Sequence, residues 1–212
     1  MEITWLGHSS FLIVDSKGRK ILTDPFDETV GYKVFNDEVD LVTISHNHFD
    51  HNYTNLLKGN PEIIKEIGLF YKADIAVQGI PSYHDSAKGA KRGENIIYTL
   101  IVDNYKICHL GDLGHLLSEE DLRKLGEVDI LLIPVGGNYT LDGKEAAIVA
   151  KAINSKLIIP MHYKTPYVGF DIDGVENFIT NMKNAERVKS NTLKIEGPLE
   201  GLNVIKILDP PM

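Results

Sequence analysis

The chain has 212 residues, 43% of them hydrophobic and 25% charged, which suits one globular domain or two closely packed halves and excludes a disordered or low-complexity protein. Its 22 Lys and Arg against 30 Asp and Glu give a formal net charge of −8, which disfavours binding to nucleic acids and to anionic membrane surfaces. A single cysteine, Cys108, excludes an internal disulfide and fits a reducing compartment. Because the sequence also shows no leader pattern and no long apolar segment, we expect a cytoplasmic protein.

Short apolar segments separated by turn signals dominate the first half of the chain and predict β-strands. Ser16, Lys17 and Gly18 indicate a hairpin turn between two of these strands. Gly68 and Asp74 interrupt the apolar stretch 62–80, and we interpret that stretch as strands rather than a helix. Before it, strands are predicted at 3–6, 11–14, 20–23 and 40–45.

The second half of the chain mixes helices with strands. Ser118 and Asp121 form a capping-box pattern, which predicts a helix that ends at Gly126. The apolar positions of 143–153 share one helical face, and Asn154 ends that helix. The remaining segments predict a third helix at 174–184, a closing strand and surface at 186–212, and strands at 95–102, 106–110, 129–135, 157–161 and 203–208.

The two halves of the chain resemble each other in sequence. Segment 13–24 aligns without a gap onto 101–112, and the Glu-Val-Asp that begins at residue 38 recurs from residue 127 at almost the same offset. Each half therefore runs strand, turn, strand, Asp, and then a strand that opens with Glu-Val-Asp. This repetition predicts a single domain, 1–212, built from two similar halves of about 1–94 and 95–212, each supplying one sheet.

One dense group of polar residues carries the chemistry. The predicted strand at 40–45 leads directly into His46, Asn47, His48, Phe49, Asp50 and His51. Imidazole and carboxylate groups are the ligands that hold zinc and related divalent ions. In an extended segment His46 and His48 point to the same side and can share one ion, whereas a following helical turn would move Asp50 and His51 toward a second ion.

The segment SHNHFDH resembles the HxHxDH signature of the metallo-β-lactamase fold superfamily, and later motifs occur in the order typical of that family. The resemblance implies that Asp24 supports the metal loop, that His84 completes the first metal site and that Asp112 bridges both ions. It also implies that His162 completes the second site. The opening WLGHSSF and the closing PMHY are most similar to uncharacterised zinc-dependent hydrolases related to ascorbate-6-phosphate lactonase. The implied ligands are His46, His48, Asp50, His51, His84, Asp112 and His162.

The resemblance implies an α+β fold, a four-layer αββα sandwich with the metal site at one edge between the halves. It implies two Zn²⁺ ions, with Mn²⁺ or Fe as alternatives, since His and Asp ligands without Cys do not select sharply for zinc. Hydroxide bound to both metals would attack a small ester, lactone or phosphoester, and Asp50 and Asp112 would orient the water or take its proton. We therefore expect a metal-dependent hydrolase.

Other residues could orient the substrate or the ligands. His8 follows a glycine at a strand end, and His109 alternates with Cys108 in a strand, where a supporting role is favoured over direct ligation. Tyr163 follows the last predicted ligand. Arg92, beside Lys91, and Lys164 are candidates for holding an anionic small-molecule substrate, with Arg92 favoured because its planar guanidinium suits bidentate contact.

Two alternative functions use the same ligands. Iron in this site would make the protein an oxidoreductase, and a site without turnover would make it a non-catalytic metal-binding module. A serine or cysteine nucleophile is disfavoured, because Cys108 lies in an apolar strand and the sequence has no G-x-S-x-G motif. The sequence predicts no nucleic-acid or membrane partner and leaves the oligomeric state open.

Overall fold

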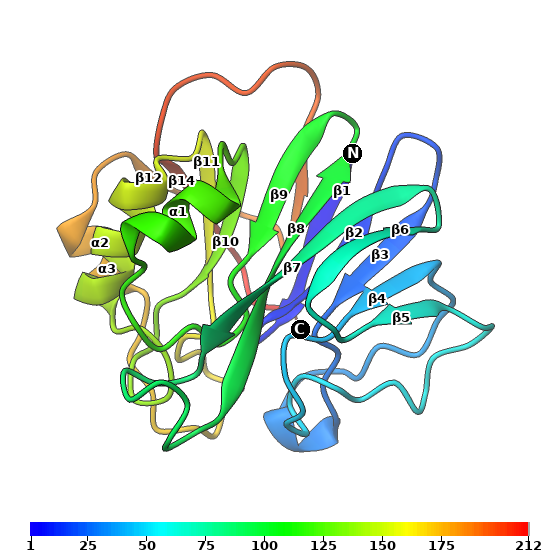
Figure 1. Cartoon of the computed structure of the whole chain (residues 1–212), viewed down its shortest axis with the longest axis horizontal. Helices are drawn as coiled ribbons and strands as arrows, with labels where there is room; N and C mark the ends of the chain where they lie inside the picture. The colour runs from blue at the N-terminus through cyan, green and yellow to red at the C-terminus, as the bar shows by residue number, and fades with distance from the viewer. Residues whose placement is uncertain (212) are drawn as a thin grey trace.

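The computed structural model describes residues 1–211 as two packed β-sheets with α-helices beside one of them (Figure 1). In order across the first sheet, these residues form six strands: β13 (Thr192–Lys194), β1 (Glu2–Gly7), β2 (Ser10–Val14), β3 (Lys20–Thr23), β4 (Leu41–Thr43) and β5 (Glu62–Ile64). The second sheet has eight strands in the same described range: β12 (Ala185–Val188), β14 (Val204–Leu208), β11 (Leu157–Met161), β10 (Ile130–Pro134), β9 (Tyr105–His109), β8 (Glu94–Val102), β7 (Ile75–Tyr83) and β6 (Gly68–Lys72).

Five consecutive strands in each sheet are paired in the same pattern. From β1 to β5 the successive pairs are antiparallel, antiparallel, parallel and parallel, and the pairs from β7 to β11 repeat that series. This agreement supports the proposal of two similar halves.

The prediction that each half supplies one sheet is wrong at the ends of the halves. β6 and β7 precede residue 94 but belong to the second sheet, and β13 joins the first sheet beside β1. A two-residue turn, Ala73 and Asp74 with φ of 47° and 57°, connects β6 to β7. Such a tight turn keeps both strands in one antiparallel ribbon, which continues into β8.

The helices begin and end largely where the sequence predicts. α1 (Glu119–Leu125) has the predicted capping box at Ser118, and α2 (Gly143–Ile153) ends at Asn154, which adopts a left-handed backbone. α3 (Glu176–Asn181) is shorter than predicted, because the chain is already extended at Met182 and β12 soon follows. A short 3₁₀ helix, η1 (Glu28–Val30), follows β3.

The outer faces of the two sheets are covered differently. α1, α2 and α3 lie beside the second sheet (Figure 1). On the first sheet, Leu22 and Val42 point away from the main core and pack with Val39, Phe35 and Leu57 from neighbouring loop segments. The predicted α+β sandwich is confirmed, and over the described chain these loop segments rather than an α-helix cover this face of the first sheet.

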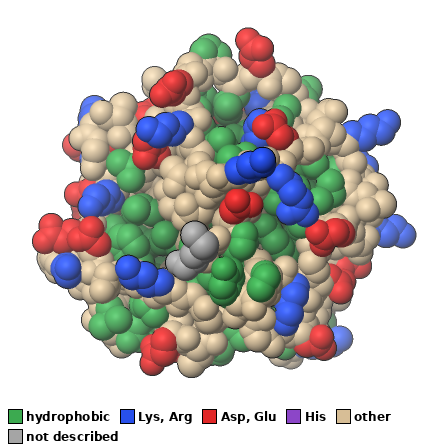
Figure 2. Space-filling model, turned by 180° about the vertical axis from the view of Figure 1, so that it is seen from behind, with side chains coloured by type: hydrophobic (Ala, Val, Ile, Leu, Met, Phe, Trp, Pro, Cys, Tyr) green, Lys and Arg blue, Asp and Glu red, His purple; other side chains and the backbone are tan. Residues whose placement is uncertain are grey.

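The surface seen from behind carries acidic and basic side chains interspersed with apolar ones (Figure 2). None of the helices in residues 1–211 is long and apolar enough to cross a membrane.

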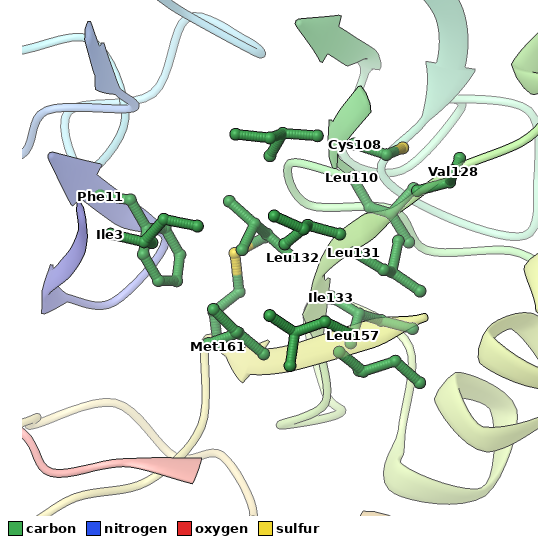
Figure 3. Close-up of a cluster of buried hydrophobic side chains, with 14 of the residues drawn as sticks. Ile3, Phe11, Cys108, Leu110, Val128, Leu131, Leu132, Ile133, Leu157 and Met161 are labelled. Carbon is green, nitrogen blue, oxygen red and sulfur yellow. The ribbon is translucent and has the colours of Figure 1, made fainter. Parts of the chain in front are cut away.

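The main core lies between the two sheets. Ile3 and Phe11 from the first sheet face Leu132 and Met161 from the second, and all four side chains are fully buried (Figure 3). Burying each side chain of this size contributes about 1.5–3 kcal/mol. This packing fixes the sheets relative to each other, and so determines which strand ends meet at the edge of the sandwich.

Candidate metal centre

The predicted ligands lie at the carboxyl ends of strands that share a direction. β1 and β3 run the same way because each is antiparallel to β2, and β4 is parallel to β3. In the second sheet β7 and β9 likewise flank β8, and β11 follows β9 through two parallel pairs. Loops at such strand ends meet at one edge of a sheet. The residues placed there are His8, Asp24, 46–51, His84, Asp112 and His162.

Three histidines form the first ligand group, which we define as His46, His48 and His84. One ring nitrogen of each lies within 4.8 Å of the corresponding nitrogens of the others. Nε2 of His46 is buried and has no hydrogen-bond partner within residues 1–211. Because an unsatisfied buried nitrogen costs free energy, this atom fits a metal ligand better than a structural side chain.

The second ligand group consists of Asp50, His51 and His162, whose ligand atoms, with one from His8, also lie within 4.8 Å of one another. The backbone N–H of His51 donates to the carbonyl oxygen of His48 at 3.0 Å, so the chain turns between the two groups. This turn brings Asp50 and His51 to His162, while the ring of His51 also lies beside that of His46, with centroids 4.2 Å apart.

Asp112 lies between the two ligand groups. Its Oδ2 is 3.2 Å from Nε2 of His84, 3.2 Å from Nε2 of His162 and 3.3 Å from Nε2 of His51. Two ligands on one tetrahedral zinc ion, with bonds of about 2.0–2.1 Å, lie about 3.3 Å apart. Oδ2 of Asp112 therefore lies at a ligand-to-ligand separation from histidines of both groups.

Asp24 holds two of the ligand rings in orientation. Its carboxylate accepts hydrogen bonds from Nδ1 of His51 at 2.8 Å and from the backbone N–H and hydroxyl of Ser45 at 2.7 and 2.5 Å. Because the Ser45 hydroxyl donates to Asp24, its oxygen accepts from Nδ1 of His46 at 2.9 Å. Both rings are thus protonated at Nδ1 and present Nε2 to the site, as metal-binding histidines commonly do.

Backbone strain is concentrated at three residues of the site. His8, Asp24 and His162 have φ values of 52°, 40° and 51°, in the left-handed region that favours glycine. Each such residue costs about 1–3 kcal/mol, and positions of this kind cluster at functional sites. The packed sheets therefore hold these side chains in a fixed arrangement.

The charges of the site suit a bound cation. Burial and neighbouring His51 lower the pKa of His46 to about 3, and burial and neighbouring His162 lower the pKa of His8 to about 4. Burial lowers the pKa of His51, but Asp112 and Asp24 raise it well above its usual value. The buried carboxylates of Asp112 and Asp24 thus stabilise positive charge beside them. Together with the histidines and the unpartnered Nε2 of His46, they form a set of groups that fits divalent metal ions.

A cavity of about 460 Å³ opens beside both ligand groups. Its lining includes Tyr139, Phe170, Lys91 and Arg92. The Arg92 guanidinium lies 5.2 Å from the centre of the Tyr139 ring, and within residues 1–211 no carboxylate forms an ion pair with Arg92 or Lys91. The prediction placed Arg92 near the substrate, and the structure brings it to the cavity. A larger cavity of about 810 Å³ shares His48 and Arg92 with the first.

Asp85 organises the loop that carries these cations, and the sequence analysis did not identify it. Its carboxylate accepts backbone N–H groups of Ala87, Gly89, Lys91 and Arg92 at 2.7 to 3.0 Å. Burial raises the pKa of Asp85, but these N–H groups outweigh burial and lower it below its usual value. An Asp followed by closely spaced glycines is the signal that could have revealed this loop.

Two further residues that line the cavity, Tyr139 and Phe170, were not predicted from the sequence. Tyr139 follows the Gly136-Gly137-Asn138 turn, and its carbonyl oxygen accepts a hydrogen bond from Nδ1 of His84 at 3.0 Å. Phe170 lies in a loop after β11 that carries no motif. The glycine turn was a usable signal for Tyr139, whereas nothing in the sequence indicates Phe170.

Tyr163 and Lys164, which the sequence places near the substrate, are not among the residues that line the cavity, which corrects the prediction for both. Tyr163 packs against Trp5, with ring centroids 5.1 Å apart, and belongs to the apolar core. Nζ of Lys164 donates to the carbonyl oxygen of Phe170 at 2.6 Å. The left-handed backbone at His162 turns the chain at this point, so the following residues leave the site.

His109 supports the loops that carry site residues. Its Nε2 donates to the carbonyl oxygen of Ser9 at 2.8 Å, and its Nδ1 accepts the backbone N–H of Gly111. The Ser9 hydroxyl in turn donates to Asp112 at 3.4 Å. His109 is fully buried and belongs to none of the clusters of potential metal ligands in the described chain, as predicted.

Comparison with known proteins gives consistent matches. Residues 2–162 match the family model described as a β-lactamase superfamily domain. A UPF0173 metal-dependent hydrolase from Methanoregula boonei is 30% identical over 96% of this chain and 98% of its own, and one from Thermococcus onnurineus is 32% identical over 78% and 85%. The crystal structure of a candidate Zn-dependent hydrolase of the metallo-β-lactamase superfamily from Thermotoga maritima superposes with a TM-score of 0.83 at 37% identity, covering 98% of each chain.

Proposed function

Because this chain belongs to the metallo-β-lactamase superfamily and is a metal-dependent hydrolase by family, we propose that it uses two divalent ions to hydrolyse a small ester, lactone or phosphoester. The observation that carries this proposal is the position of Asp112. One of its oxygens lies 3.2 to 3.3 Å from histidines of both ligand groups, so the two groups are close enough to share a carboxylate.

When bound, such ions activate a water molecule as the nucleophile at neutral pH and polarise the carbonyl or phosphoryl group under attack. Asp50 and Asp112 both line the cavity, so their carboxylates can accept hydrogen bonds from that water and orient it. Burial raises the pKa of Asp50, but the hydrogen bond from His8 and the charge of His51 keep it far below its usual value. Asp50 is therefore an ionised acceptor at neutral pH.

The donor set supports zinc as the resident metal, with manganese and iron as alternatives. The single cysteine, Cys108, would alter this preference as a thiolate ligand, but it is fully buried in β9. Burial raises the pKa of Cys108 to about 12, so it remains a neutral thiol at neutral pH. The catalytic centre is thus built from imidazole and carboxylate alone.

We further propose that the substrate is a small anionic molecule. Arg92 and Lys91 line the cavity, and ion pairs to them are absent from the described chain. Unpaired cations beside a metal site suit a phosphate or carboxylate group. The formal net charge of −8 supports a small molecule rather than a nucleic acid as the substrate.

The test is hydrolysis of a panel of lactones, aryl esters and phosphodiesters by zinc-loaded protein, with His48→Ala and Asp112→Asn as ligand variants. We expect measurable turnover and its loss by more than about 100-fold in both variants, since even residues that only support ligands change activity 10- to 100-fold. His115→Gln is the matched control, because His115 belongs to none of the clusters of potential metal ligands within residues 1–211, and its ring nitrogens contact backbone groups of Tyr83 and Leu116. Equal activity in Asp112→Asn and the control would refute the proposal.

A further inference from the structure

His8 is buried in the candidate metal centre, where one of its ring nitrogens lies within 4.8 Å of the ligand atoms of the second ligand group. It follows β1 directly, its side chain is 1% exposed, and its backbone is left-handed. A non-glycine residue with a strained backbone at a buried position indicates that the imidazole itself has a role there. The preceding Gly7 also has a positive φ, so the turn that presents His8 is tightly specified.

His8 contacts all three members of the second ligand group. Its Nε2 lies 3.1 Å from Oδ2 of Asp50, and its carbonyl oxygen accepts the backbone N–H of His162 at 3.0 Å. Its ring centroid is 4.1 Å from that of His162 and 5.0 Å from that of His51. The first ligand group has no comparable contact with His8 in the described residues.

The direction of the hydrogen bond follows from the chemistry of the partners. An ionised carboxylate can only accept, so Nε2 of His8 donates to Asp50. The same residue also accepts the indole N–H of Trp5 at its carbonyl oxygen, at 3.0 Å, which anchors its backbone to the apolar core. His8 therefore connects a rigid part of the first sheet to one ligand from each sheet.

We propose that His8 is the positioning residue of the second ligand group, holding the Asp50 carboxylate with its side chain and the His162 backbone with its carbonyl oxygen. This inference rests on the proposed function, in which the second ligand group binds a divalent ion. Because only that group is contacted, His8 governs the affinity for the second ion and leaves the first ion unaffected.

The experiment measures zinc affinity at both sites by chelator competition in the full-length protein. We expect His8→Ala to keep the first affinity and to weaken the second by about 10- to 100-fold, the range for residues that orient ligands. His8→Gln should restore most of the second affinity, since its amide N–H can occupy the place of Nε2–H. His115→Gln serves as the histidine control.

His8→Asn separates backbone effects from the hydrogen bond. Asparagine tolerates a left-handed backbone but is too short to reach Asp50, so this variant should fold like the wild type and weaken the second ion as His8→Ala does. Unchanged second-ion affinity in both variants would overturn the inference while leaving the proposed function intact. Failure of His8→Gln to restore binding would also overturn it, since His8 would then be a direct ligand. A wild type that binds no second ion would instead refute the two-ion proposal itself.

Discussion

Asp24 illustrates how a single buried residue supports the metal centre without lining its cavity. Burial raises the pKa of Asp24, but nearby His109 and His51 outweigh burial, so the carboxylate is ionised. We predict that Asp24→Asn weakens zinc binding at both ligand groups by about 10- to 100-fold, because His51 and, through Ser45, His46 lose their orientation. Chelator competition measures the affinities, and unchanged values at both sites would contradict this role.

Arg92 tests the proposed substrate class. We predict that Arg92→Ala raises KM for an anionic substrate by about 10-fold or more, since a hydrogen bond to a charged group contributes about 1.5–3 kcal/mol. KM for a neutral ester of similar size should change little, which provides the control within the same variant. Steady-state kinetics measures KM for both substrates. Equal changes in KM for the anionic and the neutral substrate would exclude a specific contact of Arg92 with the anion.

Residue-level prediction succeeded where a residue type and its spacing carry the chemistry. The motif at 46–51 locates four potential ligands because imidazole and carboxylate groups rarely gather without a function. It failed for Tyr163 and Lys164, whose directions depend on the left-handed backbone at His162. At the same residue the backbone N–H of His162 donates to the carbonyl oxygen of His8, a contact between distant segments that local sequence does not encode.

Among the elements, the loop from Asp85 to Gly93 links the fold to substrate binding. We predict that Asp85→Ala raises KM for an anionic substrate as Arg92→Ala does, because the carboxylate that holds Arg92 and Lys91 by their backbone N–H groups is lost. Lys88→Ala, an exposed change in the same loop, is the matched control. Zinc content should be measured alongside, since His84 precedes this loop, and an unaltered KM would contradict the role of Asp85.

Apolar strands and capped helices were predictable at the element scale, because alternation, caps and glycines act locally. As expected, Ser118 caps the N-terminus of α1 and Asn154 caps the C-terminus of α2. β12 and β13 were not predicted individually, since their residues are polar or partly exposed. Their extended conformation is stabilised by pairing, since β12 lies parallel to β14 and β13 lies antiparallel to β1 from the other end of the chain.

For the whole molecule, each ligand group joins the two sheets, since His84 and His162 follow strands of the second sheet and the motif at 46–51 follows the first. We predict that chelation lowers Tm by about 5–10 °C. Loss of the more weakly held ion alone already gives this shift, since an ion present at about 100 times its Kd adds about 2.7 kcal/mol and each kcal/mol shifts Tm by about 2–4 °C at this size; loss of both ions would about double it. Scanning calorimetry before and after chelation, with zinc returned as the control, measures this change in Tm. Identical melting curves would contradict the prediction.

The arrangement of the two sheets was partly predictable from the internal sequence repeat. The matched pairing of β1–β5 and β7–β11 agrees with that repeat. The sheets to which β6 and β13 belong were not predictable from this repeat. β6 joins the second sheet because the turn at Ala73 and Asp74 pairs it with β7. β13 joins the first sheet by pairing with β1, a contact between opposite ends of the chain.

The central claim is that one chain holds two divalent ions in the first and second ligand groups. Elemental analysis of the purified protein, reporting the metal and the number of ions per chain, tests it most directly. We predict about two zinc ions per chain, falling in Asp112→Asn because both groups lose their shared carboxylate. Iron in their place would indicate redox chemistry, and a protein that takes up no metal even on reconstitution would contradict the account.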